Sequence, residues 1–189
     1  MKLEDECKTA YVFNWIFAFL PYWWRFMQCL NKFYTSKKDD NVQYNQLWNA
    51  GKYFSCLVSP TVLYFLTKSA ADSGNKYETN ALYWVYFFCH IVQTTYCYIW
   101  DIYMDWGLWR QNDRSKPNYA LREKLNYAPW FYYWSMFSDL VLRYIYILFL
   151  YKLGSSSSFF NNINALFAIS TFCEAFRRAQ WALLRVENE

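Results

Sequence analysis

The sequence predicts an all-α membrane protein, a polytopic bundle of about five transmembrane helices. The first observation is composition, because 25% of the 189 residues are aromatic, well outside the usage of soluble domains. The second is a series of five long runs with few or no charged residues. The mean hydropathy of −0.15 does not oppose this, because that index scores Tyr and Trp as polar although bilayer surfaces favour both.

The first two runs predict helices that contain charged residues near the membrane. One helix is expected over about residues 11–33. The second begins in the segment LWNAGKYF at 47–54 and ends near residue 66. The connection between them is polar, as is typical of a short solvated loop.

The third helix is expected over residues 81–106, and its first 20 residues carry no charge. About 20 mostly apolar residues suffice to cross the hydrocarbon core of a bilayer. The run ends at Asp101 and Asp105, which lie four residues apart on one helical face among three tryptophans. This pattern indicates an exit from the membrane, since Trp rings favour the bilayer surface.

The last two helices are expected over about residues 127–152 and from residue 159 to the C-terminus, separated by a serine-rich turn. In the fourth, Asp139 and Arg143 lie one turn apart and can pair. In the fifth, Glu174 and Arg178 have the same spacing, with Arg177 at the edge of their stripe.

Charged residues within or beside these runs should face the interior of the bundle. A charge at the bilayer centre costs about 2.5–3.5 kcal/mol on insertion scales. Four cations against two carboxylates would give a positive interior that attracts a small anion, and arginine can donate two parallel hydrogen bonds to a tetrahedral oxyanion. The residues concerned are Lys52, Asp139, Arg143, Glu174, Arg177 and Arg178, with Tyr53, Tyr132 and Tyr146 as hydroxyl donors.

The same charges allow a structural interpretation. Asp139 with Arg143, and Glu174 with Arg178, could pair only to hold helices in register. Arg177 and Arg178 could also mark a helix end whose side chains extend to the membrane surface.

Enzymatic chemistry is not indicated. The sequence has no Ser/His/Asp set, no Gly-rich phosphate loop and no metal-spaced cluster, and its six cysteines include no CxxC pair. We therefore expect no catalytic residues, no metal, no cofactor and no nucleic-acid partner, and we expect contact with the lipid bilayer.

Basic residues orient the predicted bundle. The loops after the first and third helices and the end of the fifth hold eleven Lys and Arg residues, against five on the opposite side. The positive-inside rule then makes the C-terminus cytoplasmic. Five spans would leave the N-terminus outside although no signal peptide is evident, so an upstream helix is expected to be missing from this sequence.

Five segments with distinctive sequences occur in order along the chain. They are LWNAGKY (47–53), YIWDIYMDWGL (98–108), DLVLR (139–143), EAFRRAQW (174–181) and LLRVENE (183–189). Taken together, they resemble the EXS domain family, the membrane domain shared by eukaryotic inorganic-phosphate exporters and related Golgi proteins. The resemblance covers nearly the whole chain, so residues 1–189 are interpreted as a single EXS-type transmembrane domain. It is expected to be incomplete, because the exporters also carry an SPX domain and earlier helices.

The resemblance implies a transporter that exports inorganic phosphate at the plasma membrane or the Golgi, with a homodimer as a further expectation. The alternative is a Golgi membrane protein without an SPX domain that recycles phosphate, or retains or sorts other proteins. Tyr146 stands where the exporters have a tryptophan and is counted with the pathway. Asp101, Asp105 and Asp139 look like structural anchors. The implied phosphate pathway comprises Arg25, Lys52, Tyr53, Arg143, Tyr146, Glu174, Arg177 and Arg178.

The predicted orientation can be tested by labelling a single cysteine. In a background without reactive cysteines, Ser115→Cys should react with an impermeant thiol reagent only from the cytoplasmic side, because the residue lies in the most basic loop. Reaction from outside the cell, or from the lumen of isolated vesicles, would show that the orientation is wrong.

Overall fold

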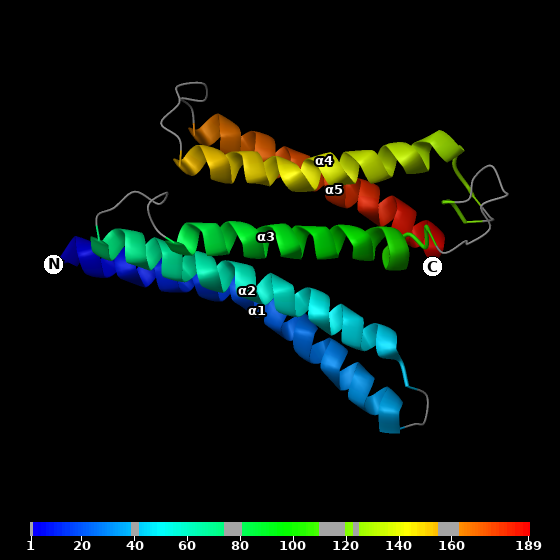
Figure 1. Ribbon diagram of the computed structural model, residues 1–189, viewed down its shortest axis with the longest axis horizontal. Coiled ribbons are helices and arrows are strands. Elements are labelled where there is room, and N and C mark those ends of the chain that lie inside the picture. Colours follow the sequence, from blue (N-terminus) through cyan, green and yellow to red (C-terminus); the bar gives the residue numbers. More distant parts are fainter. Residues whose placement is uncertain (1, 39–41, 74–80, 110–119, 123–124, 155–162) are drawn as a thin grey trace. The chain divides into compact units, whose positions relative to one another are not determined.

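A computed structural model describes residues 2–38, 42–73, 81–109, 120–122, 125–154 and 163–189. Side chains are described for 12–38, 42–69, 81–109, 120–122, 125–145 and 168–189. These residues contain five α-helices and one π-helical turn and no strand (Figure 1), which confirms the all-α prediction with five main helices. In the described part of the chain, none of the helices combines the length and apolar character needed to cross a membrane.

The first two helices, α1 (Lys2–Lys38) and α2 (Tyr44–Ser73), are longer than the uncharged runs suggested. Polar residues at both ends continue the helical backbone, and each helix continues through an internal proline, Pro21 or Pro60. The third run is divided, because the α-helix ends at Trp100 and the next five residues form the π-helical turn η2. The elements are α1 (Lys2–Lys38), α2 (Tyr44–Ser73), α3 (Ala81–Trp100), η2 (Asp101–Asp105), α4 (Pro129–Gly154) and α5 (Ile163–Asn188).

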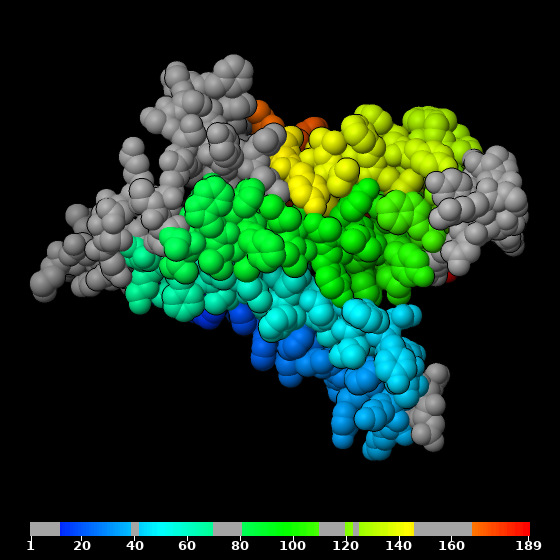
Figure 2. Space-filling view, viewed as in Figure 1, coloured from blue at the N-terminus to red at the C-terminus, as the bar shows by residue number. Residues whose placement is uncertain are grey.

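The chain forms two compact units, Met1–Gln93 and Thr94–Glu189. In the first, α1 and α2 run side by side in opposite directions (Figure 1). The Trp15 indole donates a hydrogen bond to Thr61 Oγ1 across them at 3.3 Å. Between α2 and the start of α3, Ser59 Oγ and His90 Nδ1 lie 3.2 Å apart. Aromatic rings are visible along the outer surface of α2 and α3 (Figure 2).

The second unit has its core where η2, the start of α4 and the end of α5 meet. Fully or almost fully buried side chains from each element pack there with those of residues 106, 108 and 121. The cluster consists of Ile102, Trp106, Leu108, Leu121, Tyr132, Met136 and Leu184.

A sharp turn after η2 delivers two of these side chains to the core. Gly107 has φ +65°, a left-handed conformation that glycine adopts at little cost at a helix C-terminus. The Leu108 amide then donates to Ile102 O at 2.9 Å. Trp106 and Leu108, on either side of the glycine, are both buried.

The buried carboxylate of Glu187 joins the last turn of α5 to the start of α4. Its Oε1 accepts hydrogen bonds from the Tyr132 hydroxyl and, at 2.9 Å, from the Asn126 amide. Its Oε2 lies 2.8 Å from Arg122 Nη2 as an ion pair. The Glu187 carboxylate thus binds Arg122, Asn126 and Tyr132 at once.

Replacing Glu187 with alanine should destabilise the second unit. Removing one partner of a buried ion pair costs about 3–5 kcal/mol, because the remaining charge is left without its counterion. The free energy of unfolding of the purified protein, followed by tryptophan fluorescence in detergent, measures this. Glu189→Ala is the matched control, since that exposed residue pairs with Arg185 on the surface, and it should change the free energy by about 0.5 kcal/mol or less. Equal effects of the two substitutions would contradict the prediction.

Candidate functional site

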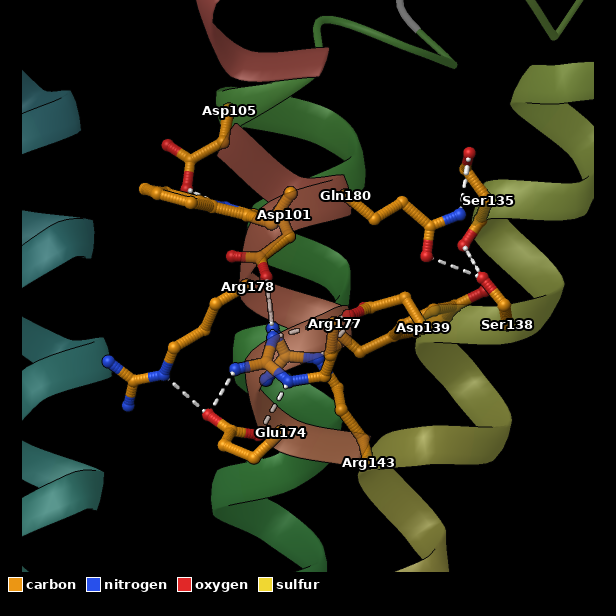
Figure 3. A network of polar contacts seen from close by, with 12 residues as sticks. Asp101, Asp105, Ser135, Ser138, Asp139, Arg143, Glu174, Arg177, Arg178 and Gln180 are labelled. Carbon is orange, nitrogen blue, oxygen red and sulfur yellow. Dashed lines mark hydrogen bonds and ion pairs between the residues drawn. The ribbon is translucent and has the colours of Figure 1, made fainter. Parts of the chain in front are cut away.

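A network of charged side chains joins η2, α4 and α5 in the second unit (Figure 3). Helical spacing explains part of it. Asp139 and Arg143 lie one turn apart on α4, and Glu174 precedes Arg177 and Arg178 by three and four residues on α5. Both ion pairs that the spacing indicated, Asp139 with Arg143 and Glu174 with Arg178, are present.

Arg143 joins two buried carboxylates. Its Nε donates to Asp139 Oδ2 at 2.8 Å, and its Nη2 donates to Asp101 Oδ2 on η2. The Asp139 side chain is only 1% exposed. A carboxylate at that depth requires a cation and hydrogen bonds around it, and Arg143 provides both.

Arg177 approaches the same two aspartates from α5. Its Nη1 donates to Asp139 Oδ1 at 3.2 Å and lies 3.9 Å from Asp101 Oδ2. Its other face binds Glu174 through two parallel hydrogen bonds, from Nε at 2.9 Å and from Nη2 at 2.8 Å. This is the bidentate fork that arginine forms with a planar or tetrahedral oxyanion.

The network runs from a buried end to an exposed end. Arg143 and Arg177 are buried apart from 12% of each side chain, whereas Glu174 is 46% and Arg178 70% exposed. Arg178 Nε donates to Glu174 Oε1 at 2.7 Å, and the rest of its guanidinium extends away from the cluster (Figure 3). Glu174 is therefore the only one of the three carboxylates in this network that is both substantially exposed and shared between two arginines.

The expected positive excess is not present in this cluster. The sequence interpretation left Asp101 outside the interior charges, but the structure brings it to Arg143, so three arginines meet three carboxylates among the described residues. The physical reason is that a buried guanidinium is costly without a counterion. Lys52, the fourth cation of the expected set, belongs to the first unit.

The other pathway candidates lie elsewhere. Arg25 on α1 is exposed and donates to Gln28 at 2.9 Å. Lys52 on α2 is buried, and its Nζ lies 4.8 Å from the centre of the Tyr53 ring. These three residues are in the first unit. Tyr146 falls within α4, but its side chain lies outside the described residues.

Asp105, the remaining anchor candidate, accepts a hydrogen bond from the Trp181 indole at 3.1 Å. Both carboxylates of η2 thus face α5, although only Asp101 contacts arginine in the contacts resolved here. Within the described ranges, no group of His, Cys, Asp and Glu side chains is arranged to hold a metal ion.

A neutral polar layer next to the charges was not anticipated. Gln180 Nε2 donates to Ser135 Oγ at 2.9 Å, and Gln180 Oε1 accepts from Ser138 Oγ at 2.7 Å (Figure 3). All three side chains are buried between α4 and α5. The sequence spacing could have indicated this layer. Gln180 follows Arg177 by three residues and Ser135 precedes Asp139 by four, so the neutral and the charged residues lie on the same helix faces.

Comparison with known proteins gives a consistent result along the whole chain. A family model described as the EXS family matches residues 1–189. Mouse "Solute carrier family 53 member 1" is 30% identical over 184 residues, which cover 96% of this chain and 25% of the relative. "SPX and EXS domain-containing protein 1" of Dictyostelium discoideum is 32% identical over 181 residues, covering 92% and 18%.

A third relative, "Xenotropic and polytropic retrovirus receptor 1 homolog" of Xenopus laevis, is 31% identical over 175 residues. That alignment covers 90% of this chain and 23% of the relative. The chain thus spans a quarter or less of the length of each of these curated relatives.

Asp101→Asn should lower the folded amount of the protein in membranes. The substitution removes one of the two carboxylates that neutralise buried Arg143, and breaking such a contact costs about 3–5 kcal/mol. Abundance measured by quantitative blotting and by size-exclusion profile tests this, with Glu189→Gln, an exposed carboxylate outside the network, as the control that should remain near the wild-type level. Normal abundance of Asp101→Asn together with lost transport would assign the aspartate to the pathway instead.

Proposed function

Because the chain belongs to the EXS family, we propose that it forms the conducting part of a membrane transporter that exports inorganic phosphate. The observation that carries the proposal is the arginine series Arg143, Arg177 and Arg178, which leads from a buried end to an exposed one. Three planar guanidinium groups in sequence offer successive bidentate contacts to a tetrahedral oxyanion. The name of the mouse relative, a solute carrier, supports transport as the general activity.

We propose further that lipid covers the helices. Large apolar side chains are exposed on every α-helix, among them Phe17, Trp24, Phe88, Trp130 and Phe172. So many exposed large apolar side chains are unusual on a soluble monomer and typical of contact with a membrane or a partner. A polytopic helical bundle at the plasma membrane or the Golgi, with a cytoplasmic C-terminus, would place these side chains in a bilayer, and a homodimer would cover part of them.

In this proposal, phosphate competes with Glu174 for the arginines. Glu174 occupies the bidentate fork of Arg177 and also contacts Arg178, yet it is the most exposed carboxylate of the network. An anion that displaces it would find two guanidinium groups already oriented. Asp101 and Asp139 would keep Arg143 and Arg177 in place, and they would limit the affinity so that phosphate can leave again.

The remaining candidates extend the proposed pathway. Arg25, Lys52 and Tyr53 on the first unit, and Tyr146 on α4, would contribute further cationic and hydroxyl contacts, as the resemblance implies. Asp101, Asp105 and Asp139 would serve as structural anchors. No cofactor or catalytic residue takes part in this scheme.

One observation favours a second function. In the contacts resolved for the second unit, each of the three arginines already contacts a carboxylate, as a purely structural network would require. The alternative is a Golgi membrane protein that retains or sorts other proteins, or recycles phosphate there. If the protein retains or sorts other proteins, phosphate flux should not depend on the arginines. Its function should then depend on the basic loop, residues 110–124.

Arg178→Lys should reduce phosphate efflux about tenfold, which corresponds to ~1.4 kcal/mol of lost stabilisation. The charge is kept, but the planar fork that binds an oxyanion bidentately is lost. Efflux of radiolabelled phosphate from cells lacking their own exporter measures the effect, normalised to the amount of protein in the membrane. Arg185→Lys is the matched control, because Arg185 is also exposed on α5 but pairs with Glu189 outside the network.

The pathway would be disproved by unchanged flux in well-expressed Arg143→Ala and Arg178→Ala variants. That result would support the sorting interpretation. A loss of flux confined to these variants, with the control unchanged, would support transport through the arginines.

A further inference from the structure

The C-terminal end of η2 is capped by a side chain from another helix. Asn188, in the last turn of α5, donates from Nδ2 to Asp105 O at 3.0 Å and to Met104 O at 3.4 Å. Its Oδ1 accepts from Arg122 Nη1 at 3.2 Å. Both ends of this amide are therefore engaged, and each of its contacts reaches more than 60 residues back along the chain.

A helix terminus needs such a partner, because its last carbonyl groups have no amide of their own helix to accept from. The π-helical turn is closed by the Trp106 amide, which donates to Asp101 O at 2.8 Å, and the chain then reverses at Gly107. A Cβ atom at position 107 would clash with Asn188 Oδ1. Asn188 is thus packed directly against the turn that it caps.

The cap acts on the turn that carries the charged site. Asp101, the first residue of η2, contacts Arg143 and Arg177, while Asp105, the last, accepts from the Trp181 indole. Trp181 and Asn188 are seven residues apart on α5, two turns along one face. The end of α5 therefore holds η2 at both the backbone and the side chain of Asp105, four residues from the carboxylate that neutralises Arg143.

We propose that Asn188 is a positioning residue for the phosphate pathway. By capping η2 it fixes Asp101 against Arg143, and so it sets how much of the Arg143 charge is left to attract an anion. This inference rests on the proposed function. Without the cap, η2 opens more often, Asp101 neutralises Arg143 less completely, and phosphate binds more tightly and leaves more slowly.

Hydrogen exchange tests the cap itself, without reference to transport. In the full-length protein purified in detergent, Asn188→Ala should accelerate exchange of the amides in residues 101–109 about fivefold, roughly the effect of losing one hydrogen bond. Asn188→Asp is the second variant, because it is isosteric and keeps the contact with Arg122 while losing the donor to the carbonyls. Glu189→Gln, an exposed neighbour that does not contact η2, is the control and should leave exchange unchanged.

Phosphate kinetics test the positioning role. Both Asn188 variants should lower the half-saturating phosphate concentration and the maximal efflux rate per molecule in the membrane, each by about threefold. A merely destabilised protein would lose maximal rate at an unchanged half-saturating concentration. Unchanged exchange in both variants overturns the cap, and faster exchange with unchanged half-saturation overturns its role in positioning.

The two proposals fail in different ways. If the wild-type protein carries no phosphate in the same assay, the proposed function fails and the use of the cap in transport fails with it. If the wild-type protein transports phosphate while the Asn188 variants leave the exchange rates of amides 101–109 unchanged, only the inference about Asn188 is overturned.

Discussion

The fold of the second unit depends on the pairing of buried carboxylates with buried arginines. Asp139 is almost completely enclosed, and it is stable there because Arg143 from its own helix and Arg177 from α5 both donate to it. Neither arginine could be buried without the carboxylates in turn. This mutual requirement fixes the register of α4 against α5 and draws η2 toward both helices.

The layer of neutral polar groups beside the charges has a related effect. Gln180 bonds two serines of α4, so a shift of α5 by one residue would break these hydrogen bonds and the Arg177–Asp139 contact together. Such directional contacts specify one alignment of two helices, whereas the aromatic residues around them would tolerate several. A precisely aligned helix pair is also what a series of oriented guanidinium groups requires if it is to bind an oxyanion.

A balanced network is compatible with transport if its carboxylates differ in exposure. Asp101 and Asp139 are buried and hold Arg143 and Arg177. Glu174 is nearly half exposed and pairs with Arg177 and Arg178. An anion from solution can replace an exposed carboxylate at a much lower cost than a buried one, because less desolvated charge is left unpaired. The position of η2, and therefore of Asp101, then influences how strongly the site attracts an anion.

The sequence by itself determined the five helices, the short-range ion pairs and the family. Uncharged runs indicate helices, and pairs such as Asp139 with Arg143 follow from the helical repeat alone. Tertiary structure decided the contacts of Asp101, the role of Gln180 and the change from α to π at Asp101. Asp101 and Arg143 are 42 residues apart, so their contact depends on how three helical elements pack. The π-helical turn also depends on tertiary packing. A sequence periodicity of 3.6 residues does not indicate where a helix accommodates one extra residue. In the folded chain this happens at η2, where Asp101 and Ile102 are buried.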